Sequence, residues 1–137
     1  SGDSTSTRLD LLALNFRESV QVAIETKRIW DTSTAQTLDA DVQRILEFKL
    51  ATADKTTAPP EIQFGVVAAV TRNAEYIEYF STIEAERPAA TLYPEFAKLV
   101  SLANATRGRV FLQEWQRDGK KYRQYLVYCV FRIPSSY

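Results

Sequence analysis

The sequence contains no histidine, and this absence excludes several kinds of catalytic and metal site. Without an imidazole, no side chain has an ordinary pKa near neutrality, and neither a Ser-His-Asp nor a Cys-His nucleophile pair can form. Zinc and iron sites that include histidine are excluded for the same reason. An enzyme built on this chain would need carboxylates, tyrosine or lysine. We therefore predict that the protein is not an enzyme and that it binds no cofactor and no metal.

Cysteine, glycine and long apolar runs are also scarce. Cys129 is the single cysteine, so internal disulfides and four-cysteine metal sites are excluded. It lies in the apolar run 126–131, where we expect a small buried hydrophobic side chain. Gly65, Gly108 and Gly119 stand singly, so the chain has no phosphate-binding loop of the dinucleotide or P-loop type. No apolar run reaches the roughly 18 residues that a membrane-spanning helix needs.

The composition is that of an ordinary globular domain, with 45% apolar and 25% charged residues in a chain of 137. A chain of this length is expected to fold as one domain, which we place at residues 8–137. Residues 1–7 are small and polar, and we predict a flexible tether or a remnant of cloning or processing. Residues 53–60 contain Pro59 and Pro60 and are the candidate for an internal linker.

The predicted fold class is α+β, with about four helices packed on a small antiparallel sheet. Apolar residues recur at helical spacing in four regions, which predict helices over 8–19, 38–53, 61–85 and 93–103. Two alternatives remain open, because residues 20–30 fit a strand as well as a continued helix, and residues 62–67 fit a short strand. In the second helix, Asp39 and Asp41 are expected in the first turn, and Asp41 and Arg44 on a solvated polar face.

The last third of the chain predicts a β-hairpin. Residues 109–117 and 120–133 are rich in β-branched and aromatic residues and flank Asp118-Gly119, a preferred pair for a two-residue primed turn. With that turn, the facing pairs are Arg117 with Lys120, Trp115 with Tyr122, Glu114 with Arg123, Leu112 with Tyr125, Phe111 with Leu126, and Val110 with Val127. Both faces are apolar, so we expect helices on one face and another strand, a partner or a second copy on the rest.

Aromatic and basic residues gather around the hairpin and form the candidate partner-binding site. These residues are Trp115, Tyr122, Tyr125, Arg109, Arg117, Lys120, Lys121 and Arg123. We predict a non-enzymatic protein-interaction or structural module that acts through this surface, with self-association as its simplest form. The alternative is a nucleic-acid or anionic-polymer binder, because stacking aromatics beside cations suit such ligands.

The distribution of charge bears on both hypotheses. The formal net charge is zero, with 17 basic and 17 acidic residues, and a domain without net charge is a poor generic nucleic-acid binder. Residues 35–90 nevertheless carry five basic and nine acidic groups, whereas residues 105–137 carry seven and two. An acidic middle and a basic hairpin could pair within the domain, between copies or with an acidic partner.

A third hypothesis rests on carboxylates. Glu75 and Glu78 lie three residues apart on one predicted helix face, and Glu84 and Glu86 extend the acidic stretch. Such a cluster could bind a divalent cation or supply an acid and a base, but the Glu-x-x-His ligands of carboxylate-bridged metal bundles are absent. We expect a solvated helix face.

The two ends of the chain resemble small bacterial envelope lipoproteins. The resemblance rests on the polar leader 1–7 and on three hairpin segments: Gly108-Arg109-Val110-Phe111-Leu112-Gln113-Glu114-Trp115, Asp118-Gly119-Lys120-Lys121-Tyr122 and Leu126-Val127-Tyr128. In those proteins a helix packs on a sheet that closes with a Trp-bearing strand, a turn and a Tyr-rich strand. The lipid-bearing cysteine that would precede Ser1 is not in this chain, and the helical middle does not match. The resemblance implies a periplasmic or surface-attached, non-catalytic domain.

Overall fold

The computed structural model describes residues 11–15, 19–47, 62–81, 94–102 and 105–133. The fold is of the predicted α+β class. Its elements in chain order are β1 (Leu11–Asn15), β2 (Val20–Arg28), α1 (Thr32–Glu47), β3 (Ile62–Thr71), α2 (Ala74–Ser81), the 3-10 turn η4 (Pro94–Phe96), α3 (Ala97–Ser101), β4 (Thr106–Arg117) and β5 (Lys120–Arg132). No helix in these ranges is long and apolar enough to cross a membrane.

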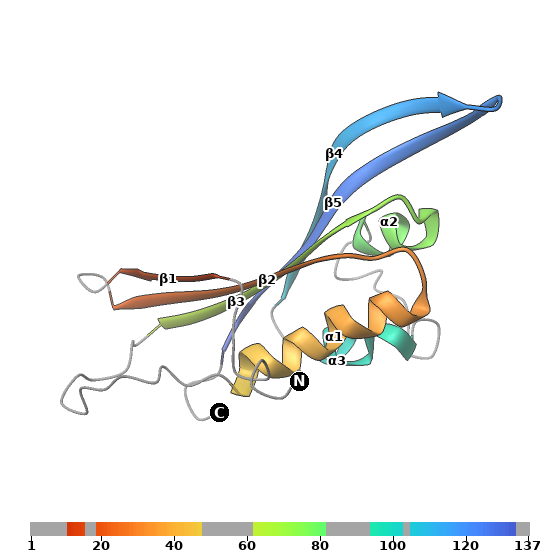
Figure 1. The fold of residues 1–137 in the computed structure, drawn as a ribbon. Helices are drawn as coiled ribbons and strands as arrows, with labels where there is room; N and C mark the ends of the chain where they lie inside the picture. Colours follow the sequence, from red (N-terminus) through yellow and green to blue (C-terminus); the bar gives the residue numbers. More distant parts are fainter. Residues whose placement is uncertain (1–10, 16–18, 48–61, 82–93, 103–104, 134–137) are drawn as a thin grey trace, which may run out of the picture.

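The strands form one five-stranded sheet in the order β1-β2-β3-β5-β4. Strands β2 and β3 are parallel and are joined through α1, whereas the other neighbours are antiparallel. Helices α1 and α3 lie under one face of the sheet, and α2 lies beneath the start of the β4–β5 hairpin (Figure 1). The sheet is therefore mixed and not purely antiparallel, and its central strand, β3, is parallel to β2 and antiparallel to β5.

Two predicted helices are wrong in the described part of the chain. Residues 11–15, expected in the first helix, form β1, which pairs with β2. Residues 62–71, expected in the third helix, form β3, and only Ala74–Ser81 is helical. The strand alternatives over 20–30 and 62–67 are confirmed. Long-range pairing decided both segments. β3 is rich in β-branched residues and pairs with a strand on each edge, whereas β1 contains no β-branched residue and is a strand through its pairing with β2.

The second predicted helix is confirmed but begins earlier than expected, at Thr32. Asp31 caps it, because the backbone N–H of Thr34 donates to Asp31 Oδ1 at 2.9 Å while Thr34 Oγ1 accepts from the N–H of Asp31 at 3.1 Å. Asp39 and Asp41 consequently lie well inside the helix and not in its first turn. Residues 48–53, the predicted end of this helix, lie outside the described residues. The short helix predicted over 93–103 is confirmed as η4 and α3.

Side chains along the strands alternate between the two sides of the sheet. One side faces the helices, and the other, the helix-free side, is covered by no helix of the described ranges. The helix-facing side forms the core with residues from α1, including Ala23, Val67, Val127, Phe131 and Ile45. Cys129 lies in this core and is fully buried, as predicted. An aromatic cluster joins α2 to η4, where the rings of Tyr79 and Phe96 stack with centroids 5.0 Å apart.

The hairpin turns at Asp118-Gly119, as predicted, with φ of 52° and 76°. The predicted pairs are confirmed from the turn as far as Glu114 with Arg123, and Gln113 faces Gln124. A bulge at Leu112 then shifts the register by one residue, so the three predicted pairs beyond it are wrong. Phe111 faces Tyr125 and Val110 faces Leu126, and Phe111 thereby moves to the helix-facing side.

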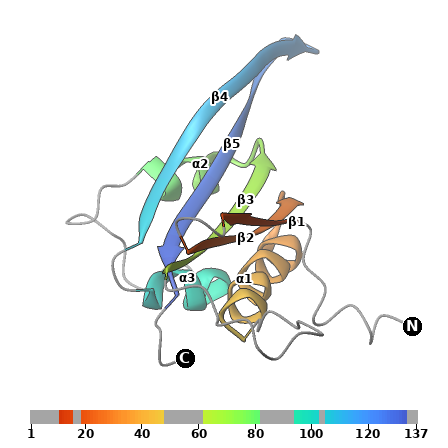
Figure 2. The ribbon, with the colours of Figure 1, turned by 90° about the vertical axis from the view of Figure 1, so that its left-hand side faces the viewer.

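The hairpin extends far beyond the rest of the sheet. The pairing of β3 with β5 ends where Thr71 faces Tyr125, so residues 113–124 form a two-stranded ribbon (Figure 2). Two strands alone are marginally stable in water. This ribbon has side-chain support on both faces, from the stacked rings of Trp115 and Tyr122 and from the ion pair of Arg123 Nε with Glu114 Oε1 at 2.8 Å.

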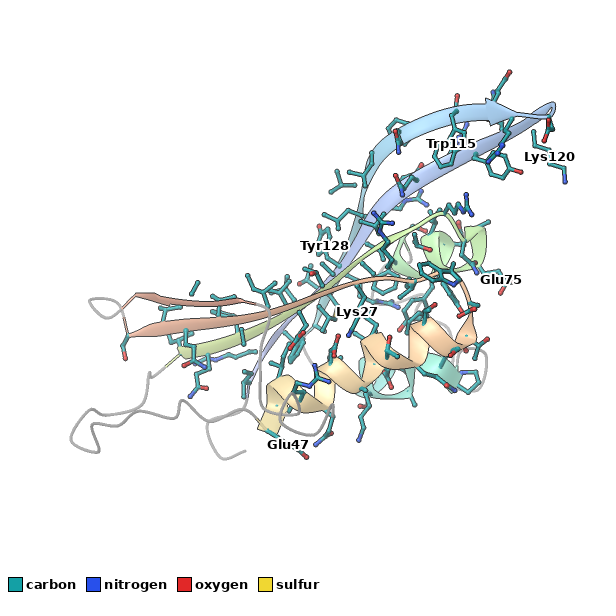
Figure 3. The ribbon with its side chains drawn as sticks, in the orientation of Figure 1. Lys27, Glu47, Glu75, Trp115, Lys120 and Tyr128 are labelled. Atoms are coloured by element: carbon teal, nitrogen blue, oxygen red, sulfur yellow. The ribbon has the colours of Figure 1, made fainter. Side chains whose placement is uncertain are left out.

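A buried charge cluster joins β2 to α1 and corrects the prediction that Asp41 and Arg44 are solvated. The side chains of Asp41 and Glu25 are 0% and 2% exposed. Arg44 Nη1 lies 3.0 Å from Asp41 Oδ1 and 3.4 Å from Glu25 Oε1, and Lys27 Nζ lies 3.6 Å from Asp41 Oδ2. Lys27 reaches the cluster from β2, between the sheet and α1 (Figure 3). Two acids and two bases thus neutralise one another under the sheet.

Asp39 ties α1 to the start of α3. Its carboxylate accepts hydrogen bonds from the backbone N–H groups of Lys98 and Leu99 at 2.9 and 2.8 Å. Burial raises the pKa of Asp39 above its ordinary value, because the loss of solvation outweighs the stabilisation by these two donors. The folded protein therefore binds a proton at Asp39 more readily than the unfolded chain does.

This shift predicts a pH-dependent contribution to stability. As the pH falls from about 7 to about 4, the wild-type chain should gain free energy of unfolding relative to Asp39→Asn, which cannot titrate. Asp31 is the matched control with the opposite sign, because hydrogen bonds from Thr34 lower the pKa of Asp31. The wild-type chain should lose stability relative to Asp31→Asn as the pH falls below about 4, the ordinary range for Asp. Urea unfolding at a series of pH values measures both, and parallel curves for the two variants would contradict the account.

Candidate functional site

The structure distributes the eight predicted site residues over four places. Trp115 and Tyr122 stack on the helix-free side of the ribbon, with ring centroids 5.7 Å apart. Three cations, Arg117, Lys120 and Lys121, are exposed at the tip, and none of them forms an ion pair with another described side chain. The other three are Arg109, Tyr125 and Arg123, which make contacts within the domain. Figure 3 shows Trp115 on the ribbon and Lys120 at its end.

Arg109 and Tyr125 lie at the base of the hairpin and anchor it to α2. The guanidinium of Arg109 lies 5.1 Å from the centroid of the Tyr125 ring, and its Nη1 donates to the carbonyl oxygen of Ile77 at 3.4 Å. The ring of Phe111 meets that of Tyr125 edge-on at 5.5 Å. Arg107, a neighbour on β4, lies 4.5 Å from the ring of Tyr79. These contacts set the direction in which the hairpin leaves the sheet.

Arg123 is engaged by Glu114 on the ribbon. Its Nε donates to Glu114 Oε1 at 2.8 Å, and this hydrogen bond, with the charge of the carboxylate, raises the pKa of Arg123. The pair lies on the helix-facing side of the ribbon, opposite to Trp115. Cations for an external anion are therefore provided at the tip by Arg117, Lys120 and Lys121.

The outer edge of β4 carries apolar residues that the sequence analysis did not single out. Val110, Phe111 and Leu112 are consecutive, and they are 49%, 52% and 46% exposed. β4 is the last strand in the sheet order, and within the described ranges no strand pairs with its outer edge. Strict alternation had assigned these residues to two packed faces. The bulge at Leu112 breaks that alternation and leaves all three in contact with solvent.

The turn geometry determines which backbone groups of β4 point outward. In a two-residue hairpin the flanking residues, Arg117 and Lys120, exchange both backbone hydrogen bonds, and such pairs recur at every second residue. Trp115 with Tyr122 is the next such pair. The N–H groups of Glu114 and Gln116 therefore point away from β5, toward the outer edge. This edge offers donors and acceptors to an added strand.

Apolar side chains also cover the helix-free side of the sheet, and this surface is continuous with the apolar run on β4. Its described residues alternate with core residues and are mostly half-buried; they include Val22, Ile24, Phe64, Val66, Val70, Leu126, Tyr128 and Val130. Tyr128 lies over Gly108 of β4, where its ring occupies the space that a Cβ would need. Val110 faces Leu126 and extends the same surface to the edge. In Figure 1 the helices lie on the opposite side.

The carboxylates Glu75 and Glu78 lie exposed on α2, and Glu75 is labelled in Figure 3. Glu84 and Glu86 lie outside the described residues. Across the described ranges, no group of three or more Cys, Asp or Glu side chains is placed to hold a metal ion. Glu75 and Glu78 both face solvent, so they do not lie in the enclosed cleft that a catalytic acid and base pair would need.

The eight predicted residues thus form no single cluster, and the edge of β4 is the feature that sequence reasoning missed. A signal for it exists in the sequence, since Val110-Phe111-Leu112 is a run of three apolar residues in a strand whose other residues, apart from Trp115, are polar or glycine. Family models, curated proteins and solved structures were compared with this chain, and none matches it.

Proposed function

We propose that this chain is a non-enzymatic protein-interaction module that binds through the outer edge of β4, and that its simplest partner is a second copy of the chain. The observation that carries the proposal is the exposed run Val110-Phe111-Leu112 on an edge strand. Three consecutive exposed apolar residues are unfavourable on the surface of an isolated domain, and a contact with a partner would remove them from water. Strand addition at a sheet edge supplies both backbone hydrogen bonds and apolar burial.

Charged residues along β4 make this edge selective. Arg107, Arg109, Glu114 and Arg117 interrupt the strand, and charges on edge strands suppress unspecific pairing. A partner strand must then match both the apolar run and the charges on either side of it. The helix-free side of the sheet, which is continuous with Val110, enlarges the contact that such a partner can bury.

Sedimentation equilibrium tests the proposal. The wild-type chain is expected to dimerise at micromolar to millimolar concentrations. Gln116→Pro removes an outward N–H while keeping the hydrogen bonds to β5, and we expect it to raise the dissociation constant about tenfold or more. Gln116→Thr keeps the N–H and is the matched control, with an expected constant close to that of the wild-type chain. Leu112→Lys, which places a charge in the apolar run, should also favour the monomer.

Two outcomes would contradict self-association at β4. One is a wild-type chain that stays monomeric at millimolar concentration, and the other is a dimer that tolerates both Gln116→Pro and Leu112→Lys. Circular dichroism and thermal melting of each variant separate lost association from lost folding. Association through backbone and apolar contacts should also depend on salt less steeply than the binding of an anionic polymer does.

The alternative function, binding of nucleic acid or another anionic polymer by the hairpin tip, has its support in the exposed cations Arg117, Lys120 and Lys121. Affinity that falls steeply with rising salt would favour it over strand addition. Attachment to a bacterial envelope, which the resemblance implies, stays a prediction and is independent of the β4 edge.

A further inference from the structure

A groove with a volume of about 380 Å³ lies on the helix-free side, where the ribbon leaves the sheet. The ends of β2 and β3 form one wall, and the ribbon forms the other. The charged, amide and aromatic side chains that line it belong to Arg28, Trp30, Arg72, Gln113, Trp115 and Gln124. Its volume is in the range of small-molecule sites. The groove is separate from the outer edge of β4 and from the cations at the tip.

The charge of the groove favours an anion. Arg28 ends β2, and Arg72 directly follows β3, the neighbouring strand, so two arginines line the groove at the ends of adjacent strands. None of the described residues that line it is acidic. Arg44 and Arg123, by contrast, are held by carboxylates elsewhere in the domain. Guanidinium groups bind phosphate and carboxylate through paired N–H donors.

The groove also presents two indole rings. Trp30 is 55% exposed, yet its backbone is held on both sides, since its N–H donates to Thr34 Oγ1 at 3.0 Å and its carbonyl accepts from Asn73 Nδ2 at 3.0 Å. Trp115 uses one ring face against Tyr122, and Arg72 lies 6.0 Å from the Tyr122 centroid. An exposed indole on a fixed backbone is a stacking surface that costs little entropy to use.

The amides complete the recognition surface. Gln113 Nε2 donates to Gln124 Oε1 at 2.7 Å, which fixes both side chains across the ribbon. Each amide has further donor or acceptor capacity for the edge of a bound ring. A neutral sugar would need acceptors for several hydroxyl groups, and the described lining includes no carboxylate to provide them. An acidic peptide would use the arginines and leave the indoles without a partner.

From these features we infer that the groove binds a nucleoside phosphate, with the base against the indole of Trp30 or Trp115 and the phosphate at Arg28 and Arg72. This ligand has both a flat ring and an adjacent anion, and it matches the amides through the polar edge of its base. The same chemistry comes from two sources, a free mononucleotide or a nucleotide within a single strand. The inference is independent of strand addition at β4.

Tryptophan fluorescence and calorimetry test the inference with defined probes. Adenosine 5′-monophosphate should bind, and should bind more tightly than either adenosine or inorganic phosphate alone. The variants Arg28→Gln and Arg72→Gln together should weaken this binding about tenfold or more, since hydrogen bonds to charged groups are lost. Trp30→Leu should weaken it through lost stacking. Arg132→Gln, which removes an exposed cation at the end of β5 away from the ribbon, is the matched control and should leave mononucleotide binding unchanged.

The source of the ligand follows from a second titration with an eight-residue thymidine oligonucleotide. Binding much tighter than that of thymidine 5′-monophosphate would assign the groove to single strands, and equal binding would assign it to free nucleotides. The inference is overturned if adenosine 5′-monophosphate does not bind, if Arg28→Gln with Arg72→Gln leaves its affinity unchanged in a folded protein, or if glucuronate or an acidic peptide binds as tightly.

Discussion

Replacement of Arg44 by methionine is expected to lower the free energy of unfolding by about 3 kcal/mol, because it leaves two buried carboxylates facing a single lysine. Glu25 and Asp41 have almost no exposed side-chain surface, and Arg44 contacts both. We expect a loss at the lower end of the range for a broken buried ion pair, because the side chain of Arg44 is 27% exposed. Methionine keeps the apolar stem, so the loss reports the charge and its hydrogen bonds. Denaturant unfolding at neutral pH gives the value.

Gln43→Met is the matched control on the same helix. Gln43 Nε2 donates to Glu47 Oε1 at 2.6 Å on the exposed side of α1, and such surface pairs contribute about 0.2–0.5 kcal/mol. If Arg44→Met cost no more than Gln43→Met, the carboxylates under the sheet would not depend on Arg44, and our description of the cluster would be wrong.

Gly65→Ala is expected to cost about 2 kcal/mol, although alanine is ordinarily the better strand residue. A Cβ at Gly65 would approach the ring of Phe131 and the Cγ2 of Ile45 more closely than real side chains do. Phe131 and Ile45 are both fully buried in the core, so neither can move away without disturbing its neighbours. Gly65 is thus the point at which α1 and β5 approach β3.

The Gly65 effect can be separated from a general sensitivity to glycine replacement. Gly119→Asn is the control, because nothing lies within 4 Å of a Cβ there and Asn tolerates its positive φ. In a double-mutant cycle, Ile45→Val should recover part of the cost of Gly65→Ala, because it removes one methyl group near the added Cβ. Equal costs for Gly65→Ala and Gly119→Asn, or an additive cycle, would argue against the close packing described.

Local signals in the sequence predicted the elements that local interactions determine. The turn at Asp118-Gly119 has the residues that its positive φ values require, and the helix over α1 has both a cap at Asp31 and an apolar stripe. The parallel pairing of β2 with β3 is different, because it joins segments about 40 residues apart. Residues 62–71 have apolar spacing that fits a helix, and only the neighbouring strands decide against it.

The candidate site, like the fold, could be predicted only where local interactions determine it. Exposure of Arg117, Lys120 and Lys121 follows from their position beside a turn. The bulge at Leu112 leaves no clear signal in the sequence, yet it moves Phe111 to the other side and exposes the run that the proposed function requires. The groove needs Arg28 from β2, Arg72 from the residue after β3 and Trp115 from β4, and their proximity depends on the strand order.

Amide hydrogen exchange, followed residue by residue by NMR, tests strand addition at β4 most directly. The N–H groups of Glu114 and Gln116 point to the outer edge of β4, whereas those of Lys121 and Arg123 point to the opposite edge of the ribbon. As protein concentration rises, exchange at Glu114 and Gln116 should slow while exchange at Lys121 and Arg123 stays fast. Exchange at Glu114 and Gln116 that is independent of concentration up to the millimolar range would contradict self-association through this edge.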